Sequence, residues 1–300
     1  MSETFQPVRP DTPGPATAPQ HAGPELIRTA DGVALALRRL GPSDGVPVVL
    51  THGTYSNHRS CMGLANHLAG GGFSCWVFDW RGHGDSGRND FRHSFDDVAE
   101  QDVPAILDAV RQRSGHSALF WIGHSGGGLI ASMWAARNPE LAREKLRGLV
   151  LLGSQATAAG ASLRHRLTIQ AFDWMLRWRR ISPGRPKNVG PEAESARLMR
   201  QWCQWNLRRR FDSLSGFDYL AGLGGVELPV LGVAGSGDRF IAPLAGCEAL
   251  VAAFGGMDAK LELFGAGQGH REDYSHNRLL LSRNASHEIW PRIAEWLGQR

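Results

Sequence analysis

Long apolar runs and paired cysteines are absent from this chain of 300 residues. No apolar stretch approaches the ~18 residues that a transmembrane helix needs, so we expect no integral membrane segment. The N-terminus also lacks the ~7–15 apolar residues of a signal peptide, which predicts a cytoplasmic location. The four cysteines stand far apart, without CxxC or metal-ligand spacing, at positions 61, 75, 203 and 247. They are predicted to be buried free thiols, and no metal or other cofactor is expected.

Large apolar residues are also scarce before residue 25, where six prolines interrupt the chain. Such a segment cannot bury enough apolar surface to offset the entropy cost of folding, so residues 1–24 are predicted to be a disordered tail. The whole chain, with 42% hydrophobic and 21% charged residues, has the composition of an ordinary globular protein. Its length suits one large α/β domain or two small ones.

Positive charge is concentrated in one segment. Residues 155–220 hold 12 Lys and Arg against five Asp and Glu, a net charge of +7, so the rest of the chain carries −3 of the total of +4. No nucleic-acid-binding motif accompanies this segment. The sequence therefore predicts a solvated basic face and no nucleic-acid partner.

Short apolar segments alternate with helical patterns from Glu25 onwards. Residues 26–40 alternate around Asp31-Gly32, the strongest short signal for a β-hairpin. Further predicted strands lie within 46–53, 73–80, 118–125, 146–154, 229–238 and 259–265. Predicted helices lie within 61–72, 93–113, 126–139, 244–254 and 286–297, the last beginning there or one turn earlier. This alternation predicts an α/β fold with a doubly wound, mostly parallel sheet and helices on both faces.

The strand within 118–125 ends in a candidate site, because ligands of such sheets bind beyond the carboxyl ends of strands. Its sequence runs into Gly123-His124-Ser125-Gly126-Gly127, and a helix follows at once. A G-x-S-x-G segment between strand and helix forms a sharp turn that raises the serine hydroxyl above the sheet. Ser125 is therefore predicted to be a nucleophile. His124 is expected to be a turn residue, because adjacent side chains diverge at such a bend.

A second strand end, within 46–53, carries a His52-Gly53 pair that lets the next amides face the nucleophile. The amides of Thr54 and Gly126 are the predicted oxyanion hole, with the Tyr55 amide as an alternative to the first. His52 is expected to be held by the structure rather than to act as a base. The polar residues that close the next strand are expected to fix their own loop; they are Asp79, Arg81 and His83.

Together these motifs resemble the α/β-hydrolase fold family. They are HG at 52–53, DWRGHGDS at 79–86, GHSGG at 123–127 and a late Gly-x-x-Asp-x-x-x-x-Pro, in the family's order over residues 25–300. The resemblance implies a serine esterase or lipase-like branch with a helical lid. Serine at the nucleophile position is unlike the dehalogenase and epoxide-hydrolase branches, which use aspartate.

The acid of the family follows the nucleophile in chain order. The strand within 229–238 ends with Asp238, whereas the strand before it ends in Gly153-Ser154 without a carboxylate. Asp238 is therefore the predicted acid, which would orient the base and stabilise its charged form.

Two histidines compete for the role of the base. The general family pattern places the base just past the last strand, which favours His270, as does the spacing from the acid. Residues 274–290, however, resemble the acid-lipase ending Y-x-H-x-D-x-x-x-x-x-x-A-x-x-E-V, in which the histidine two after the tyrosine is the base. His276 is therefore preferred, although Arg278 replaces the aspartate of that ending. His287 is expected at the surface of the last helix.

Residues 155–226, which we call the insertion, interrupt the sheet before the penultimate strand. They carry tryptophans at helical spacing, at 174 and 178 and at 202 and 205, beside further apolar residues at 172, 175, 176, 198 and 199. Each single tryptophan is more simply explained by packing against the core. Collectively they predict a helical cap over the serine and an apolar acyl or aryl pocket, while the arginines face solvent or an anionic part of the substrate. The predicted organisation is a core at 25–154 and 227–300 with a cap at 155–226.

The sequence thus predicts a serine hydrolase that cleaves a carboxylic ester with an apolar part through an acyl-enzyme. Acyl transfer, or cleavage of a thioester or amide, by the same residues is the alternative. A third hypothesis, a non-catalytic hydrolase-like binding protein, gives no reason for a full Ser/Asp/His set. The expected partner is a small-molecule ester, and the sequence predicts no oligomeric state.

Overall fold

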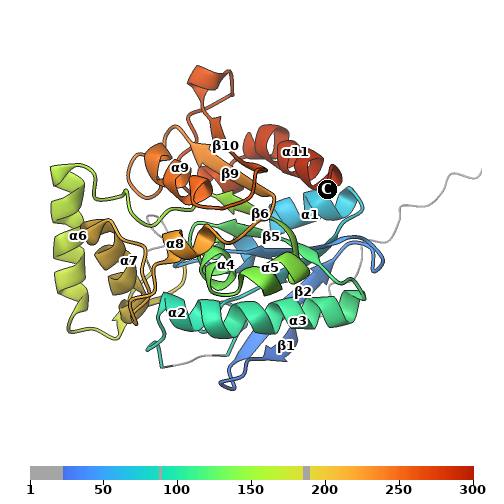
Figure 1. Cartoon of the computed structure of the whole chain (residues 1–300), viewed down its shortest axis with the longest axis horizontal. Coiled ribbons are helices and arrows are strands. Elements are labelled where there is room, and N and C mark those ends of the chain that lie inside the picture. The colour runs from blue at the N-terminus through green and yellow to red at the C-terminus, as the bar shows by residue number, and fades with distance from the viewer. Residues whose placement is uncertain (1–22, 88–89, 185–189) are drawn as a thin grey trace, which may run out of the picture.

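The computed structural model describes residues 23–87, 90–184 and 190–300. The tail predicted for residues 1–24 therefore lies almost entirely outside the described residues. Eight strands form one sheet in the order β1-β2-β4-β3-β5-β6-β9-β10 (Figure 1). Their bounds are β1 Glu25–Arg28, β2 Ala34–Leu40, β3 Pro47–Thr51, β4 Ser74–Phe78, β5 Leu119–His124, β6 Leu146–Leu152, β9 Val230–Gly235 and β10 Ala259–Phe264.

In this order β2 pairs antiparallel with both of its neighbours, β1 and β4. All the other neighbouring strands pair parallel. The predicted hairpin is confirmed: β1 and β2 join through a turn in which Gly32 has φ 87° and its amide donates to the Thr29 carbonyl at 2.9 Å. A positive φ of this kind is unstrained only in glycine. The parallel strands bring all their carboxyl ends to one edge of the sheet.

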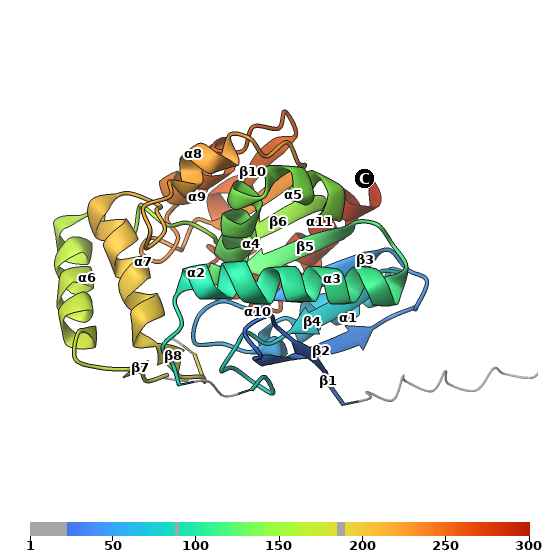
Figure 2. The ribbon, with the colours of Figure 1, turned by 60° about the horizontal axis from the view of Figure 1, so that its bottom comes forward.

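Helices cover both faces because the strand side chains alternate between them. Val49, Trp121 and Leu149 belong to one buried cluster, whereas their neighbours Val48 and Phe120 belong to the other. Helices α1 and α11 pack on the second cluster, and α3, α4 and α9 pack on the first (Figure 2). The helix bounds are α1 Met62–Gly70, α3 Val103–Ser114, α4 Gly126–Arg137, α5 Pro139–Lys145, α9 Leu244–Ala252, α10 Arg278–Leu281 and α11 Ala285–Gly298.

The helix predicted over 93–113 differs in one respect from the structure. It starts with a capping box, in which Ser94 accepts from the Asp97 amide at 3.3 Å and Asp97 accepts from the Ser94 amide at 2.7 Å. After α2, Phe95–Asp97, a π-helical turn spans Val98–Asp102 before α3 begins. Pro104 has no amide hydrogen to donate to the preceding turn, which accounts for the widened turn there.

The insertion leaves the sheet after β6 and returns at β9. Its elements are α6 Leu163–Leu176, β7 Ile181–Ser182, β8 Glu194–Ser195, α7 Ala196–Arg208 and α8 Tyr219–Leu223. Helices α6 and α7 pack against each other beyond one side of the sheet (Figure 1). The architecture confirms the predicted fold class, a doubly wound, mostly parallel sheet with a helical insertion before the penultimate strand.

None of the helices within residues 23–87, 90–184 and 190–300 combines the length and apolar character needed to cross a bilayer. All four cysteines are buried and free, as predicted.

Candidate active site

Ser125 occupies a sharp turn between β5 and α4. Its backbone has φ 54° and ψ −120°, a conformation that non-glycine residues rarely adopt. The Ser125 amide donates to the Leu152 carbonyl at 2.7 Å, which ties the turn to β6. A side chain at position 123 would place its Cβ 2.2 Å from the carbonyl carbon of Gly127, so the bend requires Gly123. The strained turn holds the serine in the wall of a cavity.

The loop after β3 lies directly against Ser125. A Cβ at position 53 would lie 2.7 Å from the Ser125 Cβ, so Gly53 permits this approach. Thr54 and Gly126 line the same cavity, and Gly126 is the first residue of α4. In the described part of the chain, neither of their amides, nor the alternative Tyr55 amide, has a hydrogen-bond acceptor. Unpaired amides beside a hydroxyl, one of them at a helix N-terminus, suit an anionic oxygen.

Asp238 follows β9, and His276 lies in the loop after β10. Asp238 Oδ1 accepts from the amides of Ile241 and Ala242 at 3.1 and 3.0 Å, while its Oδ2 lies 2.5 Å from His276 Nδ1. Burial alone would raise the pKa of Asp238, but the hydrogen bond and charge of His276 outweigh it and lower the pKa below its ordinary value. An ionised Asp238 favours a proton on His276 Nδ1, the nitrogen that it contacts, which leaves Nε2 as the ring's acceptor.

His276 and Ser125 line one cavity, but no hydrogen bond joins them among the described residues. Such a bond is often long in an unliganded site and tightens only when substrate binds. The structure therefore brings the three predicted residues together, with Asp238 and His276 in contact and Ser125 on the same cavity as His276.

The other histidines of this region lie elsewhere. His270 Nδ1 is 3.2 Å from the Gly265 carbonyl, and His270 is not part of the cavity wall. His287 is exposed in the first turn of α11. His124 is buried, which lowers its pKa to about 3, and its Nε2 lies 3.1 Å from the His276 carbonyl. A neutral His124 thus supports the loop that carries His276.

His52 is enclosed by the core. Its Nδ1 lies 2.8 Å from the Gly53 carbonyl, and its Nε2 accepts from the Trp80 amide at 3.2 Å. Burial, together with the nearby His83, lowers the pKa of His52 to about 4, so the ring is neutral. These contacts fit the structural role expected for His52.

Asp79 anchors the loop after β4. Its carboxylate accepts from the His58 amide at 2.6 Å and from the Asp85 amide at 3.1 Å, and Arg38 Nη1 lies 3.1 Å away. Arg81 plays a similar part, pairing with the buried Asp102. Burial alone would raise the pKa of Asp79, but the hydrogen bonds from His58 and Asp85 lower it to about 2.

The low pKa of Asp79 makes acid stability a test of this loop. Because the pKa is lower in the folded than in the unfolded chain, Asp79 stabilises the fold above about pH 4 and loses this effect as the pH falls towards 2. The fall in the pKa of Asp79 from 3.8 to about 2 corresponds to about 2 kcal/mol. Asp79→Asn should therefore remove about that much of the pH dependence of the free energy of unfolding, measured by urea denaturation between pH 7 and 2.

Asp85→Asn is the matched control, because Asp85 also pairs with Arg38 but its side chain is 56% exposed. It should change the free energy of unfolding by less than about 1 kcal/mol. Equal pH profiles for wild type and Asp79→Asn would show that Asp79 does not anchor the loop.

The insertion contacts the Gly53–Asn57 loop through residues that the sequence did not single out. Tyr55 Oη and Ser182 Oγ lie 2.7 Å apart, and the Asn57 side chain donates to Glu192 Oε1 at 2.6 Å. The Glu192 amide also donates to the Tyr55 carbonyl at 3.0 Å. More than 120 residues separate these partners in the sequence, and no local sequence pattern predicts the contacts between them. They connect the insertion to the loop that carries Thr54.

A second unforeseen contact is a buried group of one glutamate and two histidines. Glu194, in β8, lies 3.2 Å from His83 Nε2 and 3.4 Å from His93 Nε2. Burial alone would raise the pKa of Glu194, but the two histidines hold it well below its ordinary value. His83, expected only to fix its own loop, thus also binds the insertion to the core.

A cavity of about 620 Å³ lies between the insertion and the strand ends. Arg179 is the only Asp, Glu, Lys or Arg side chain of its described wall. The wall is otherwise largely apolar, with Phe95, Leu129, Ile169, Phe172, Met175, Met199, Trp202, Phe240 and Leu280 among its residues. A mostly apolar cavity beside a serine suits a ligand that has an apolar part.

The tryptophans of the insertion divide into two kinds. Trp202 lines the cavity and Trp205 is buried, as expected for residues that form a pocket or pack on the core. Trp174 and Trp178 do neither, being 65% and 86% exposed. The expectation that the tryptophans line the pocket or pack on the core was therefore wrong for this pair. Helical spacing places two residues on the same face of a helix, but it does not show whether that face is turned to the core or to solvent. Of the arginines, 208, 209 and 210 are exposed and lie outside the cavity wall.

One group of side chains has the atom spacing of a metal site. Donor atoms of His58, Asp79 and Asp85 lie within 4.8 Å of one another. The Arg38 guanidinium contacts both carboxylates and offsets part of their charge. We therefore assign this group to loop structure and not to metal binding.

Comparison with known proteins agrees with this geometry. A family model described as the alpha/beta hydrolase fold matches residues 46–185. Lipase member K of Mus musculus is 31% identical over 155 residues, which cover 44% of this chain and 38% of the lipase. Lysosomal acid lipase/cholesteryl ester hydrolase of Homo sapiens is 29% identical over 157 residues, covering 45% and 39%. The chain matches about two fifths of the length of these curated relatives.

Solved structures share the fold over nearly the whole chain. A monoacylglycerol lipase from Paleococcus ferrophilus has a TM-score of 0.66 at 21% identity, covering 88% of this chain and 98% of its own. An esterase from Thermogutta terrifontis has a TM-score of 0.65 at 19% identity, covering 93% and 99%. The family match, the strand order and these shared folds show that the chain has the α/β-hydrolase fold.

Proposed function

We propose that this protein hydrolyses carboxylic esters with an apolar acyl or alcohol part, through an acyl-enzyme on Ser125. One observation carries the proposal: a strained serine and an aspartate-bonded histidine open on the same apolar cavity of about 620 Å³. A strained turn and a buried acid–base pair both lower the stability of the fold. Nucleophilic catalysis explains why the protein has them, because it needs a positioned hydroxyl and a base.

In the proposed reaction, Ser125 Oγ attacks the carbonyl carbon of the ester while His276 Nε2 takes the hydroxyl proton. The carbonyl oxygen becomes an anion that accepts hydrogen bonds from the Thr54 and Gly126 amides. The carbon–oxygen bond to the alcohol then breaks, and His276 returns the proton to the alcohol. Water repeats the same steps on the acyl-enzyme, which releases the acid and restores Ser125. Asp238 keeps its charge throughout and stabilises the protonated His276.

The names of the relatives support ester cleavage in general. Those named above are lipases, an esterase and a cholesteryl ester hydrolase. We further propose that residues 155–226 act as a cap, because α6 and α7 supply much of the apolar wall opposite the serine. The core of the proposed organisation is then 25–154 with 227–300.

A panel of aryl esters with acyl chains from acetyl to palmitoyl tests this function. Each methylene that enters the cavity contributes up to about 0.8 kcal/mol, so kcat/KM should rise by up to about fourfold per methylene until the cavity is filled. Thioesters and amides of the best acyl group, run in parallel, measure the preference for esters. Activity that is highest on acetyl and falls with each added carbon would show that the cavity does not hold the acyl chain.

A further inference from the structure

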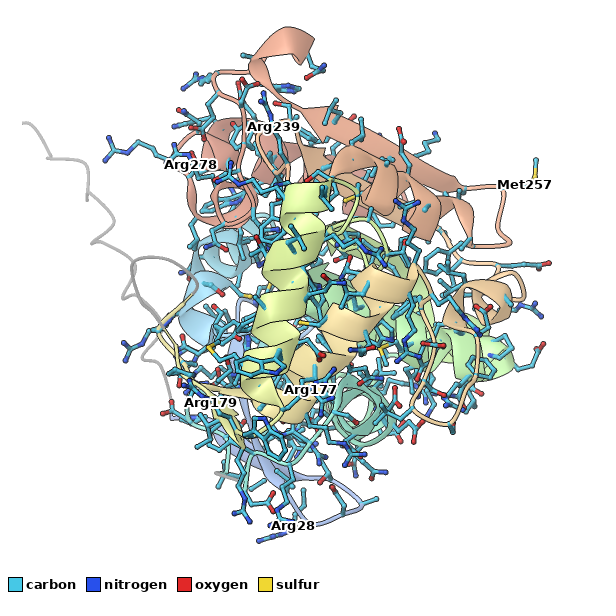
Figure 3. The ribbon with its side chains drawn as sticks, turned by 90° about the vertical axis from the view of Figure 1, so that its left-hand side faces the viewer. Arg28, Arg177, Arg179, Arg239, Met257 and Arg278 are labelled. Atoms are coloured by element: carbon cyan, nitrogen blue, oxygen red, sulfur yellow. The ribbon has the colours of Figure 1, made fainter. Side chains whose placement is uncertain are left out.

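Helix α6 carries an apolar stripe on the side that faces away from the cavity. Leu163, Leu167 and Trp174 are 73%, 56% and 65% exposed, and Trp178 follows one turn later at 86%. At 3.6 residues per turn, the first three lie within about 40° of one another around the helix axis. We call these four residues the outer stripe. Figure 3 looks onto this side of the molecule, with α6 in front.

The outer stripe is not needed to pack α6 on the protein. The opposite face of the same helix already does so through Ile169, Phe172 and Leu176, which are buried or line the cavity. A surface helix normally has one apolar face and one polar face. A second, mostly apolar face that is left in solvent, here broken only by the exposed Gln170, marks a binding surface.

Positive charge surrounds the outer stripe. Five arginines lie in or just after α6, at positions 164, 166, 177, 179 and 180, and Figure 3 shows Arg177 and Arg179 at one end of the helix. The one acidic residue of 163–180, Asp173, is buried. Within the described residues, Arg164, Arg179 and Arg180 have no carboxylate partner. Exposed leucines and tryptophans with unpaired arginines at both ends of the helix suit a membrane surface, which is apolar inside and anionic at its headgroups.

We propose that the outer stripe docks on the surface of a membrane that contains anionic phospholipids. The tryptophans and leucines would enter the headgroup boundary, where aromatic side chains are favoured, and the arginines would contact lipid phosphates. Basic residues beside an anionic lipid surface strengthen such binding and make it sensitive to salt. Docking in this way holds the cavity, which shares α6 as a wall, beside the lipid, and it requires no reaction at Ser125.

Sedimentation with sucrose-loaded vesicles tests the proposal on the full chain. The probes are vesicles of phosphatidylcholine with phosphatidylglycerol, at a ratio of about 7:3, and vesicles of phosphatidylcholine alone. We expect binding to the anionic vesicles to be about tenfold or more tighter, and to weaken as salt is raised. Trp174→Ser/Trp178→Ser should lose about tenfold or more of this binding, whereas Ser125→Ala should sediment like the wild type.

Leu26→Ser/Met257→Ser is the matched control, because both residues are exposed apolar side chains outside the insertion, and Figure 3 shows Met257 away from α6. It should bind vesicles like the wild type. The proposal is overturned if the tryptophan variant and the wild type sediment equally, or if neither binds anionic vesicles. It is also overturned if light scattering shows that the wild type is a dimer and the tryptophan variant a monomer. The outer stripe would then bind a second copy of the chain.

Discussion

Ser125→Ala should lower kcat for the best ester of the panel by on the order of 10⁶, with the fold intact. The reason is chemical: alanine has no atom that can attack the carbonyl carbon, so the acyl-enzyme cannot form. The unusual φ of 54° at this position belongs to the turn and not to the hydroxyl, so the alanine side chain fits as the serine does. Labelling by a fluorophosphonate probe should disappear in the same variant.

Ser132→Ala is a suitable control for this change. Ser132 lies in α4, the helix that follows the turn, and its hydroxyl only donates to the Gly128 carbonyl at 2.8 Å. It should keep both the esterase activity and the labelling. If Ser125→Ala retains more than about one per cent of the activity while remaining folded, Ser125 is not the nucleophile. If the wild type neither cleaves any ester nor reacts with the probe, the chain is a binding protein with a hydrolase fold.

The sheet could be predicted from the sequence because its strands are short apolar runs buried on both faces. β3, β4 and β5 are entirely buried, so every position except His124 at the end of β5 is apolar or small, and the runs are easy to see. Candidate sites followed from the same argument, since parallel strands present their carboxyl ends at one edge. Ser125 and Asp238 lie at two such ends.

The contacts of the insertion could not be predicted, because they depend on how two distant segments dock. Glu194 is buried between His83 and His93, although a glutamate in a basic segment gives no sign of burial. Trp174 and Trp202 each stand at helical spacing from another tryptophan of the insertion, yet Trp174 is in solvent and Trp202 lines the cavity. Local periodicity defines the faces of a helix, whereas docking decides which face is covered.

The choice of base was open for a related reason. The spacing from Asp238 favoured His270, because it is closer than that of His276 to the gap between acid and base that is typical of the family the motifs resemble. In the structure this loop curls into a 3-10 turn at Ala266–Gln268, and Gly269 reverses it with φ 88°. His270 is thereby folded back on the end of β10, and six further residues carry the chain to Asp238.

His276→Ala should lower kcat/KM on a short-chain aryl ester by on the order of 10⁶, close to the loss from Ser125→Ala, because the two side chains act as one unit. Without an imidazole, no group takes the Ser125 proton or returns it to the leaving alcohol. The contact of 2.5 Å between His276 Nδ1 and Asp238 Oδ2 is the observation behind this expectation. The double variant with Ser125→Ala should be no slower than either single variant.

His270→Ala should cost less than about tenfold in kcat/KM, since its ring packs on Phe264 at 4.5 Å and has no part in the cavity wall. Its effect should instead be a lower free energy of unfolding, from the lost packing at the end of β10. Both variants are measured on one ester, with circular dichroism to establish that each is folded. A folded, inactive His270→Ala beside an active His276→Ala would make His270 the base. Asp238 would then have to exchange partners during the reaction, because in the structure its carboxylate is bonded to His276.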